Sequence, residues 1–122
     1  MKRVIKECVE YKGYIIIVTE YGFYDESAKK MFPDYHCGYI SGSYHVENAM
    51  NDIDSVTIDD INVDFFGGME NEIKIINMNI DVDYNFYGFD TNHSYNNKED
   101  KTFDSVFNKC KQIVDLCEVK ND

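Results

Sequence analysis

The chain has 122 residues, of which 43% are hydrophobic and 15% aromatic, and its formal net charge at pH 7 is −11. This length predicts a single domain, residues 1–122, that buries roughly 65% of its unfolded surface, and the apolar content argues against a disordered chain. An acidic chain whose one arginine is Arg3 is not expected to bind nucleic acid directly, and no apolar run reaches the length of a membrane span or of a signal peptide.

The first forty residues predict three strands. Residues 4–10 and 14–20 form a hairpin whose turn contains Gly13, which supplies a positive φ. The second strand is apolar on both faces, as is typical of a central strand covered on both sides. Residues 21–33 contain a glycine, a charged stretch and the only proline, which predict a loop. A short third strand follows at residues 35–41.

The middle of the chain is polar and acidic. Residues 42–60 predict a long acidic loop, with a short helix at residues 46–53 as the alternative. Residues 61–66 and 73–82 alternate apolar and polar side chains, which predicts two half-buried strands. The second of these either runs on towards Phe89 as one bent strand or is followed by a separate strand.

The last element is a helix over about residues 102–118. Thr102 can cap its N-terminus, and Asp104 lies favourably in its first turn. One apolar stripe recurs at helical spacing: Phe103, Val106, Phe107, Cys110, Ile113, Val114 and Cys117. The fold class is therefore α+β, a mainly antiparallel sheet of five or six strands with one long C-terminal helix packed on one face. Such a domain is expected to be a monomer or a homodimer through a sheet edge.

Four scattered cysteines without a CxxC pair predict buried, reduced thiols and a cytoplasmic protein. His36 and Cys37 are neighbours in a strand and should face opposite ways, one buried and one exposed. Neither the ligand spacing of zinc sites nor the DxDxDG loop of calcium sites is present. No metal or cofactor is predicted.

The charge is concentrated in one block. Residues 46–90 carry eleven acids and one base, a net charge of −10, whereas residues 1–45 carry six of each. Such clustering gives one face a negative field, which attracts basic protein surfaces. The residues expected to bind a partner are Asp52, Asp54, Asp59, Asp60, Asp64, Glu70 and Glu72.

Residues 84–95 suggest a second site, because polar side chains follow an apolar strand at its end. Asp90 is placed to orient His93, as carboxylates orient catalytic imidazoles; the alternative is an Asx turn beside a surface histidine. An aromatic ligand pocket here would be formed by Tyr87, Phe89, Asp90, Asn92 and His93.

Three blocks, YHCGYI from Tyr35, FGGM from Phe66 and YGFDTNH from Tyr87, resemble a family of small proteins encoded by phages and prophages. Members carry CGYV, an acidic loop with DDID, HGGLTYS and GFDCAH blocks and a C-terminal helix. The resemblance covers about residues 34–117, with Phe66 and Thr91 replacing the histidine of HGG and the cysteine of FDCAH. It implies an accessory protein acting in the host cytoplasm, often against host defence.

Three functions follow as hypotheses. The first is a non-catalytic counter-defence protein, similar to anti-CRISPR inhibitors, that presents carboxylates to the basic nucleic-acid-binding groove of a host nuclease or effector complex. The second is a sponge that sequesters a nucleotide immune signal in the aromatic pocket. The third is a small hydrolase that uses Asp90 and His93. We favour the first because the acids are clustered.

Overall fold

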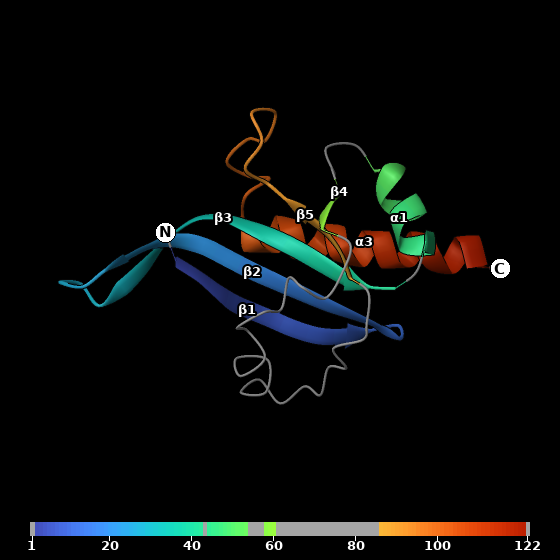
Figure 1. The fold of residues 1–122 in the computed structure, drawn as a ribbon, viewed down its shortest axis with the longest axis horizontal. Helices are drawn as coiled ribbons and strands as arrows, with labels where there is room; N and C mark the ends of the chain where they lie inside the picture. The colour runs from blue at the N-terminus through green and yellow to red at the C-terminus, as the bar shows by residue number, and fades with distance from the viewer. Residues whose placement is uncertain (1, 43, 54–57, 61–85, 122) are drawn as a thin grey trace.

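The computed structural model describes residues 2–42, 44–53, 58–60 and 86–121, which form an α+β fold with an antiparallel sheet and a C-terminal helix (Figure 1). The predicted class, the antiparallel sheet and the C-terminal helix are confirmed. The strands are β1 (Lys2–Tyr11), β2 (Tyr14–Asp25), β3 (Lys30–Ser41), β4 (Ile58–Asp60) and β5 (Phe86–Asp90), and the helices are α1 (Tyr44–Asn51) and α3 (Phe103–Asn121). Within the described residues the strand order is β1-β2-β3-β5-β4. The strands predicted at residues 61–66 and 73–82 lie outside those residues.

The first hairpin is confirmed. β1 and β2 pair antiparallel and are joined by Lys12 and Gly13, whose φ angles are 51° and 86°. Two successive positive φ values match the twist of the flanking strands, which is why a glycine is favoured here. β2 is central as predicted, since its residues 16–19 are fully buried.

The loop predicted at residues 21–33 is wrong. β2 continues to Asp25 and β3 begins at Lys30, so most of this segment is a second hairpin. Its turn is held by Asp25 Oδ1, which accepts hydrogen bonds from the backbone N–H of Ser27 at 2.8 Å and of Ala28 at 3.1 Å. An aspartate at this position stabilises a tight turn through its own side chain, so the charged stretch reverses the chain within four residues.

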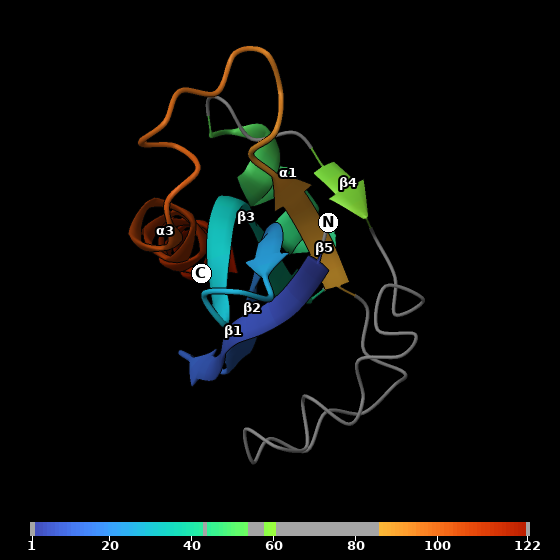
Figure 2. The same cartoon turned by 90° about the vertical axis from the view of Figure 1, so that its left-hand side faces the viewer.

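One face of the sheet is covered by the helices (Figure 2). α3 packs across β2 and β3, and α1 packs on α3. The core between them is formed by fully or almost fully buried side chains: Ile16, Val18, Ile40, Val46, Ala49, Met50, Phe89, Val106, Cys110, Ile113, Val114 and Cys117. The predicted N-cap is confirmed, because Thr102 Oγ1 accepts a hydrogen bond from the Ser105 N–H at 3.2 Å. Neither described helix is long and apolar enough to span a membrane.

The close approach of α3 to β3 depends on Gly38. A Cβ atom at this position would lie 2.5 Å from Cys110 Sγ and 2.8 Å from the Phe89 ring. Both distances are shorter than van der Waals contact, so β3 can carry no side chain at the point where the helix crosses it.

The opposite face of the sheet is also buried. Cys8, Ile17, Cys37, Tyr39 and Phe86 form a second apolar cluster there. All four cysteines are buried thiols, as predicted. Burial raises the pKa of the Cys8 thiol to about 12 and also raises that of Cys110, which keeps both thiols protonated and unreactive.

The acidic loop predicted over residues 42–60 needs correction. It begins with α1, so the helical alternative was the better prediction, and β4 forms near its end. The buried side of α1 carries Val46, Ala49 and Met50. Apolar residues at this spacing favour an amphipathic helix, even though the residues between them are polar.

Candidate functional site

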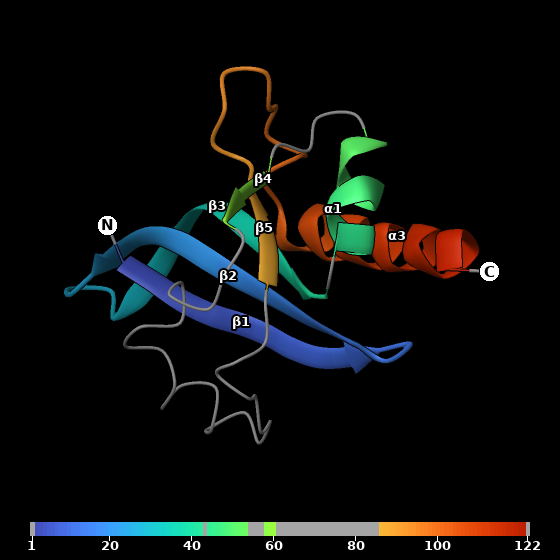
Figure 3. The same cartoon turned by 45° about the vertical axis from the view of Figure 1, so that its right-hand side comes forward.

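The described polar groups converge where β2 and β3 leave the core. The segment between β5 and α3 rises above this end of the sheet before α3 begins (Figure 3). It brings Thr91 and Lys101 to β3: Thr91 Oγ1 donates to the His36 carbonyl at 2.7 Å, and the Lys101 carbonyl lies 2.7 Å from His36 Nδ1.

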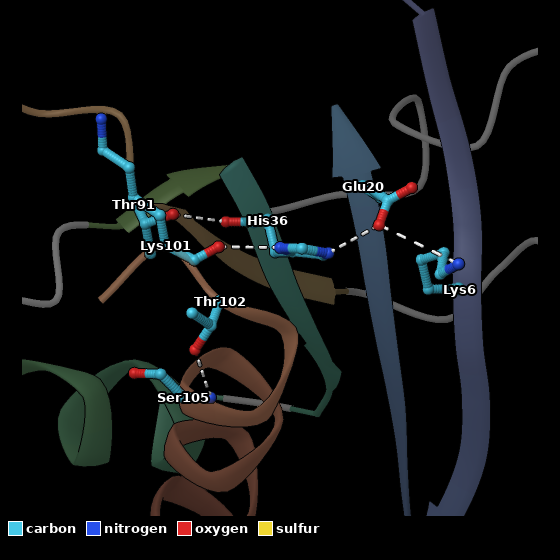
Figure 4. A network of polar contacts seen from close by, with 7 residues as sticks. All are labelled: Lys6, Glu20, His36, Thr91, Lys101, Thr102 and Ser105. Carbon is cyan, nitrogen blue, oxygen red and sulfur yellow. Dashed lines mark hydrogen bonds and ion pairs between the residues drawn. The ribbon is translucent and has the colours of Figure 1, made fainter. Parts of the chain in front are cut away.

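Glu20 and His36 form a buried pair at the centre of this site (Figure 4). The two residues face each other in the β2–β3 register, and His36 Nε2 lies 3.0 Å from Glu20 Oε1. Their side chains are only 9% and 6% exposed. Lys6 Nζ approaches the same carboxylate oxygen at 3.9 Å. A buried charge of this kind needs a partner, because its desolvation is otherwise costly.

The two contacts of His36 define how many protons the pair holds. The Lys101 carbonyl can only accept, so His36 Nδ1 carries a hydrogen and donates it. A neutral imidazole has one N–H group. The second hydrogen bond, to Glu20, therefore needs a further proton, carried by the imidazole or by the carboxyl group. Both ring nitrogens are then engaged, and the imidazole links β2, β3 and the segment that leads into α3.

A pocket of about 400 Å³ opens beside this pair. Its walls combine apolar and charged groups: Glu20, Pro33, Asp34, His36, Lys98, Lys101, Thr102 and Phe103. The Phe103 ring meets the His36 ring edge-on at 6.0 Å. The Lys101 carbonyl points at His36, whereas its ammonium group points away from the pair (Figure 4). Lys101 thus lines the pocket and, through its carbonyl, joins the segment before α3 to His36.

The predicted pairing of Asp90 with His93 is present. Asp90 Oδ1 lies 2.9 Å from His93 Nε2 and also accepts the Asn92 backbone N–H at 3.1 Å, which is an Asx turn. The two alternatives drawn from the sequence therefore coexist. The imidazole stacks on Tyr95 with ring centroids 5.0 Å apart. Such a pair can hold an imidazole in a fixed orientation.

The predicted aromatic pocket is not assembled around this pair. Phe89 is 1% exposed and belongs to the core beneath α3, with Tyr87 packed against that core. Asn92 is exposed. Tyr87 and Phe89 are two residues apart in β5, so their side chains lie on the same face of the strand. That face is the one that packs against the helices.

The predicted partner-binding acids are only partly described. Asp52 is exposed just after α1, where Glu47 is exposed as well. Asp59 and Asp60 belong to β4, the last strand of the described sheet. Asp54, Asp64, Glu70 and Glu72 lie outside the described residues.

The sequence analysis did not predict the Glu20–His36 pair. It predicted that one of His36 and Cys37 is buried and that the other is exposed. Both residues are buried, on opposite faces of the sheet: Cys37 lies in the second apolar cluster and His36 contacts Phe103. The available signal was Glu20, a charged residue that directly continues a strand apolar on both faces. A carboxylate in such a strand needs a buried partner.

Comparison with known proteins gives no assignment: no family model, no curated protein and no solved structure matches this chain.

Proposed function

We propose that this protein is a non-catalytic binding protein that presents a carboxylate-rich surface to the basic, nucleic-acid-binding groove of another protein. The observation that carries the proposal is the segregation of charge. Residues 46–90 have a net charge of −10, whereas residues 1–45 carry equal numbers of acids and bases. Charge that serves only solubility has no reason to gather in one block.

The described acids agree with this proposal. α1 is anchored to α3 through Val46, Ala49 and Met50, so the packing of the helix leaves Glu47 in solvent on its outer side. Acids held on a packed scaffold keep a fixed spacing, which favours one arrangement of basic partners over others. The resemblance to phage-encoded proteins adds the context in which the partner is a host-defence nuclease or effector.

The test is partner capture with two charge-matched variants. The first, D59N/D60N/D64N, neutralises three acids of the block. The second, E10Q/E99Q/E118Q, removes the same charge at three exposed positions outside the acidic block. Tagged proteins are incubated with host lysate and the retained proteins are identified by mass spectrometry. A basic partner retained by the wild type and the second variant but lost by the first supports the proposal. Equal retention by all three proteins contradicts it.

A further inference from the structure

Beyond the main sheet, β2 and β3 continue as a two-stranded ribbon, residues 22–33. β1 pairs with β2 only as far as Gly22, and β5 pairs with β3 only from Cys37 onward. The ribbon therefore projects from the body of the described structure, at the end opposite α1 and the C-terminus (Figure 1). Neither face of the ribbon is covered by the described helices or by the other described strands (Figure 1).

Among the described residues, most of the large hydrophobic side chains that are exposed lie on this ribbon. The exposed fractions are 60% for Phe23, 41% for Tyr24 and 48% for Phe32. Within the described residues, only one other large hydrophobic side chain, Tyr95, is comparably exposed. Single exposed apolar residues are ordinary, but aromatic residues gathered on one projecting element mark an interaction surface.

The backbone that carries the aromatic rings is fixed by strand pairing. Phe23 faces Phe32 across the two strands, and two residues earlier Tyr21 stacks on Tyr35 with ring centroids 4.9 Å apart. Phe23 and Tyr21 share a face because side chains alternate along a strand. The turn beyond them is fixed by Asp25. A backbone already fixed in this way loses little conformational entropy on binding.

One of the exposed rings already contacts a cation of this chain. Lys30 Nζ lies 5.5 Å from the centroid of Phe32. The ribbon itself is balanced in charge, with Asp25 and Glu26 against Lys29 and Lys30. The chain as a whole has a net charge of −11, and exposed aromatic rings on an anionic protein favour a cationic side chain.

We infer that the ribbon is a second contact surface for the basic partner, on which arginine side chains of that partner stack against Phe23, Tyr24 and Phe32. This inference rests on the proposed function. Arginine fits because its planar, weakly hydrated guanidinium group stacks on aromatic faces and pairs with carboxylates. A second copy of the chain fits less well, since two −11 chains repel each other, and nucleic acid is repelled by the same field.

The test is a calorimetric titration of hexa-arginine peptide at low salt into four proteins: the wild type, F23S/F32S, F23L/F32L and D59N/D60N/D64N. The leucine variant keeps apolar area but has no ring face. Binding by the wild type that weakens about tenfold in both ribbon variants supports the inference. Sedimentation of the same proteins shows whether the ribbon variants remain folded and unchanged in oligomeric state.

The titration distinguishes failure of the ribbon inference from failure of the proposed function. Unchanged affinity in both ribbon variants, with weaker binding by D59N/D60N/D64N, overturns the ribbon inference and leaves the proposed function standing. Wild-type affinity in F23L/F32L alone shows an apolar contact that needs no ring, which also overturns it. A dimer that dissociates in F23S/F32S identifies the ribbon as a self-association surface. No binding by the wild type contradicts both proposals.

Discussion

The two halves of the β2–β3 hairpin reverse the usual relation between polarity and burial. Its base buries an ionisable pair, Glu20 and His36, whereas its tip holds Phe23 and Phe32 in solvent. The two strands pair antiparallel in both halves, with a shift of register between Tyr21 and Gly22 where the halves meet, and the halves also differ in what covers them. At the base, α3 and the segment before it enclose the polar pair and satisfy it; the tip extends beyond them. The comparison separates side chains that stabilise the fold from side chains that are free to recognise a partner.

The largest expected effect is at the base. His36→Ala leaves the Glu20 carboxylate buried without its main partner, which should lower the free energy of unfolding by about 3 kcal/mol. Urea denaturation measures this loss. The double variant E20L/H36L removes both groups and keeps the site filled, so it should be clearly more stable than His36→Ala. A double variant as unstable as the single one would show that His36 matters for its shape alone.

Gly38→Ala tests the closeness of α3 to the same hairpin. The new methyl group would collide with Cys110 Sγ and the Phe89 ring, and overpacking of this kind costs about 2 kcal/mol. Thermal denaturation measures the change. Gly13→Ala is a useful comparison, because its Cβ would meet no atom and only its positive φ would be strained. A neutral Gly38→Ala would mean that α3 can move away from β3 at little cost.

The stability of the protein should fall at alkaline pH because of two ionisable groups in and beside the second apolar cluster, Cys8 and Tyr35. Burial raises the pKa of Cys8 from 9.0 to about 12 and that of Tyr35 from 10.0 to about 12. Above pH 9 the unfolded chain releases these protons while the folded chain retains them, so stability is lost as pH rises towards 12. The slope is on the order of 1 kcal/mol per pH unit for Cys8 and smaller for Tyr35, which is only partly buried. Cys8→Ala should flatten the curve between pH 9 and pH 10, and an unaltered slope would contradict the assignment.

Thr19 offers a stabilising change within the buried half. Its side chain is fully buried, and its hydroxyl oxygen has no hydrogen-bond partner among the described residues. Thr19→Val replaces the hydroxyl group by a methyl group of similar shape, which should raise the free energy of unfolding by about 1 kcal/mol. Chemical denaturation checks this value. A loss of stability would reveal that the hydroxyl group is satisfied.

The smallest effect is expected at the tip. F23S/F32S removes two aromatic side chains that are about half exposed, 60% and 48%, so the free energy of unfolding should change by only about 0.5 kcal/mol. Thermal denaturation of this variant beside His36→Ala measures the contrast between the two halves directly. A loss as large as that of His36→Ala would mean that the ribbon rings belong to the core.

The elements predicted correctly from the sequence are those whose pattern is local. The hairpin at residues 4–20 follows from apolar alternation around Gly13, and α3 follows from a stripe at helical spacing with Thr102 as its cap. The second hairpin was missed because Gly22, Pro33 and the charges between them are typical of loops. Its pairing depends on cross-strand contacts such as Phe23 with Phe32, which only the register reveals.

The candidate site divides in the same way. Asp90 and His93 are three residues apart, so their contact was predictable from local chain geometry. Glu20 and His36 are far apart in the sequence and meet only because β2 and β3 pair in one register. Their third partner is a backbone carbonyl, that of Lys101, and the identity of a residue says nothing about where its carbonyl will point. No sequence pattern predicts that these three groups lie next to one another.

The most direct test of the proposed function is capture of partners from host lysate by the wild-type protein at low and at high salt. Contacts between exposed charges are screened as ionic strength rises. We predict that a basic, nucleic-acid-binding protein is retained at low salt, is released at high salt and is displaced by added nucleic acid. The absence of any specifically retained protein at either salt, or retention of a partner that added nucleic acid does not displace, would contradict the account.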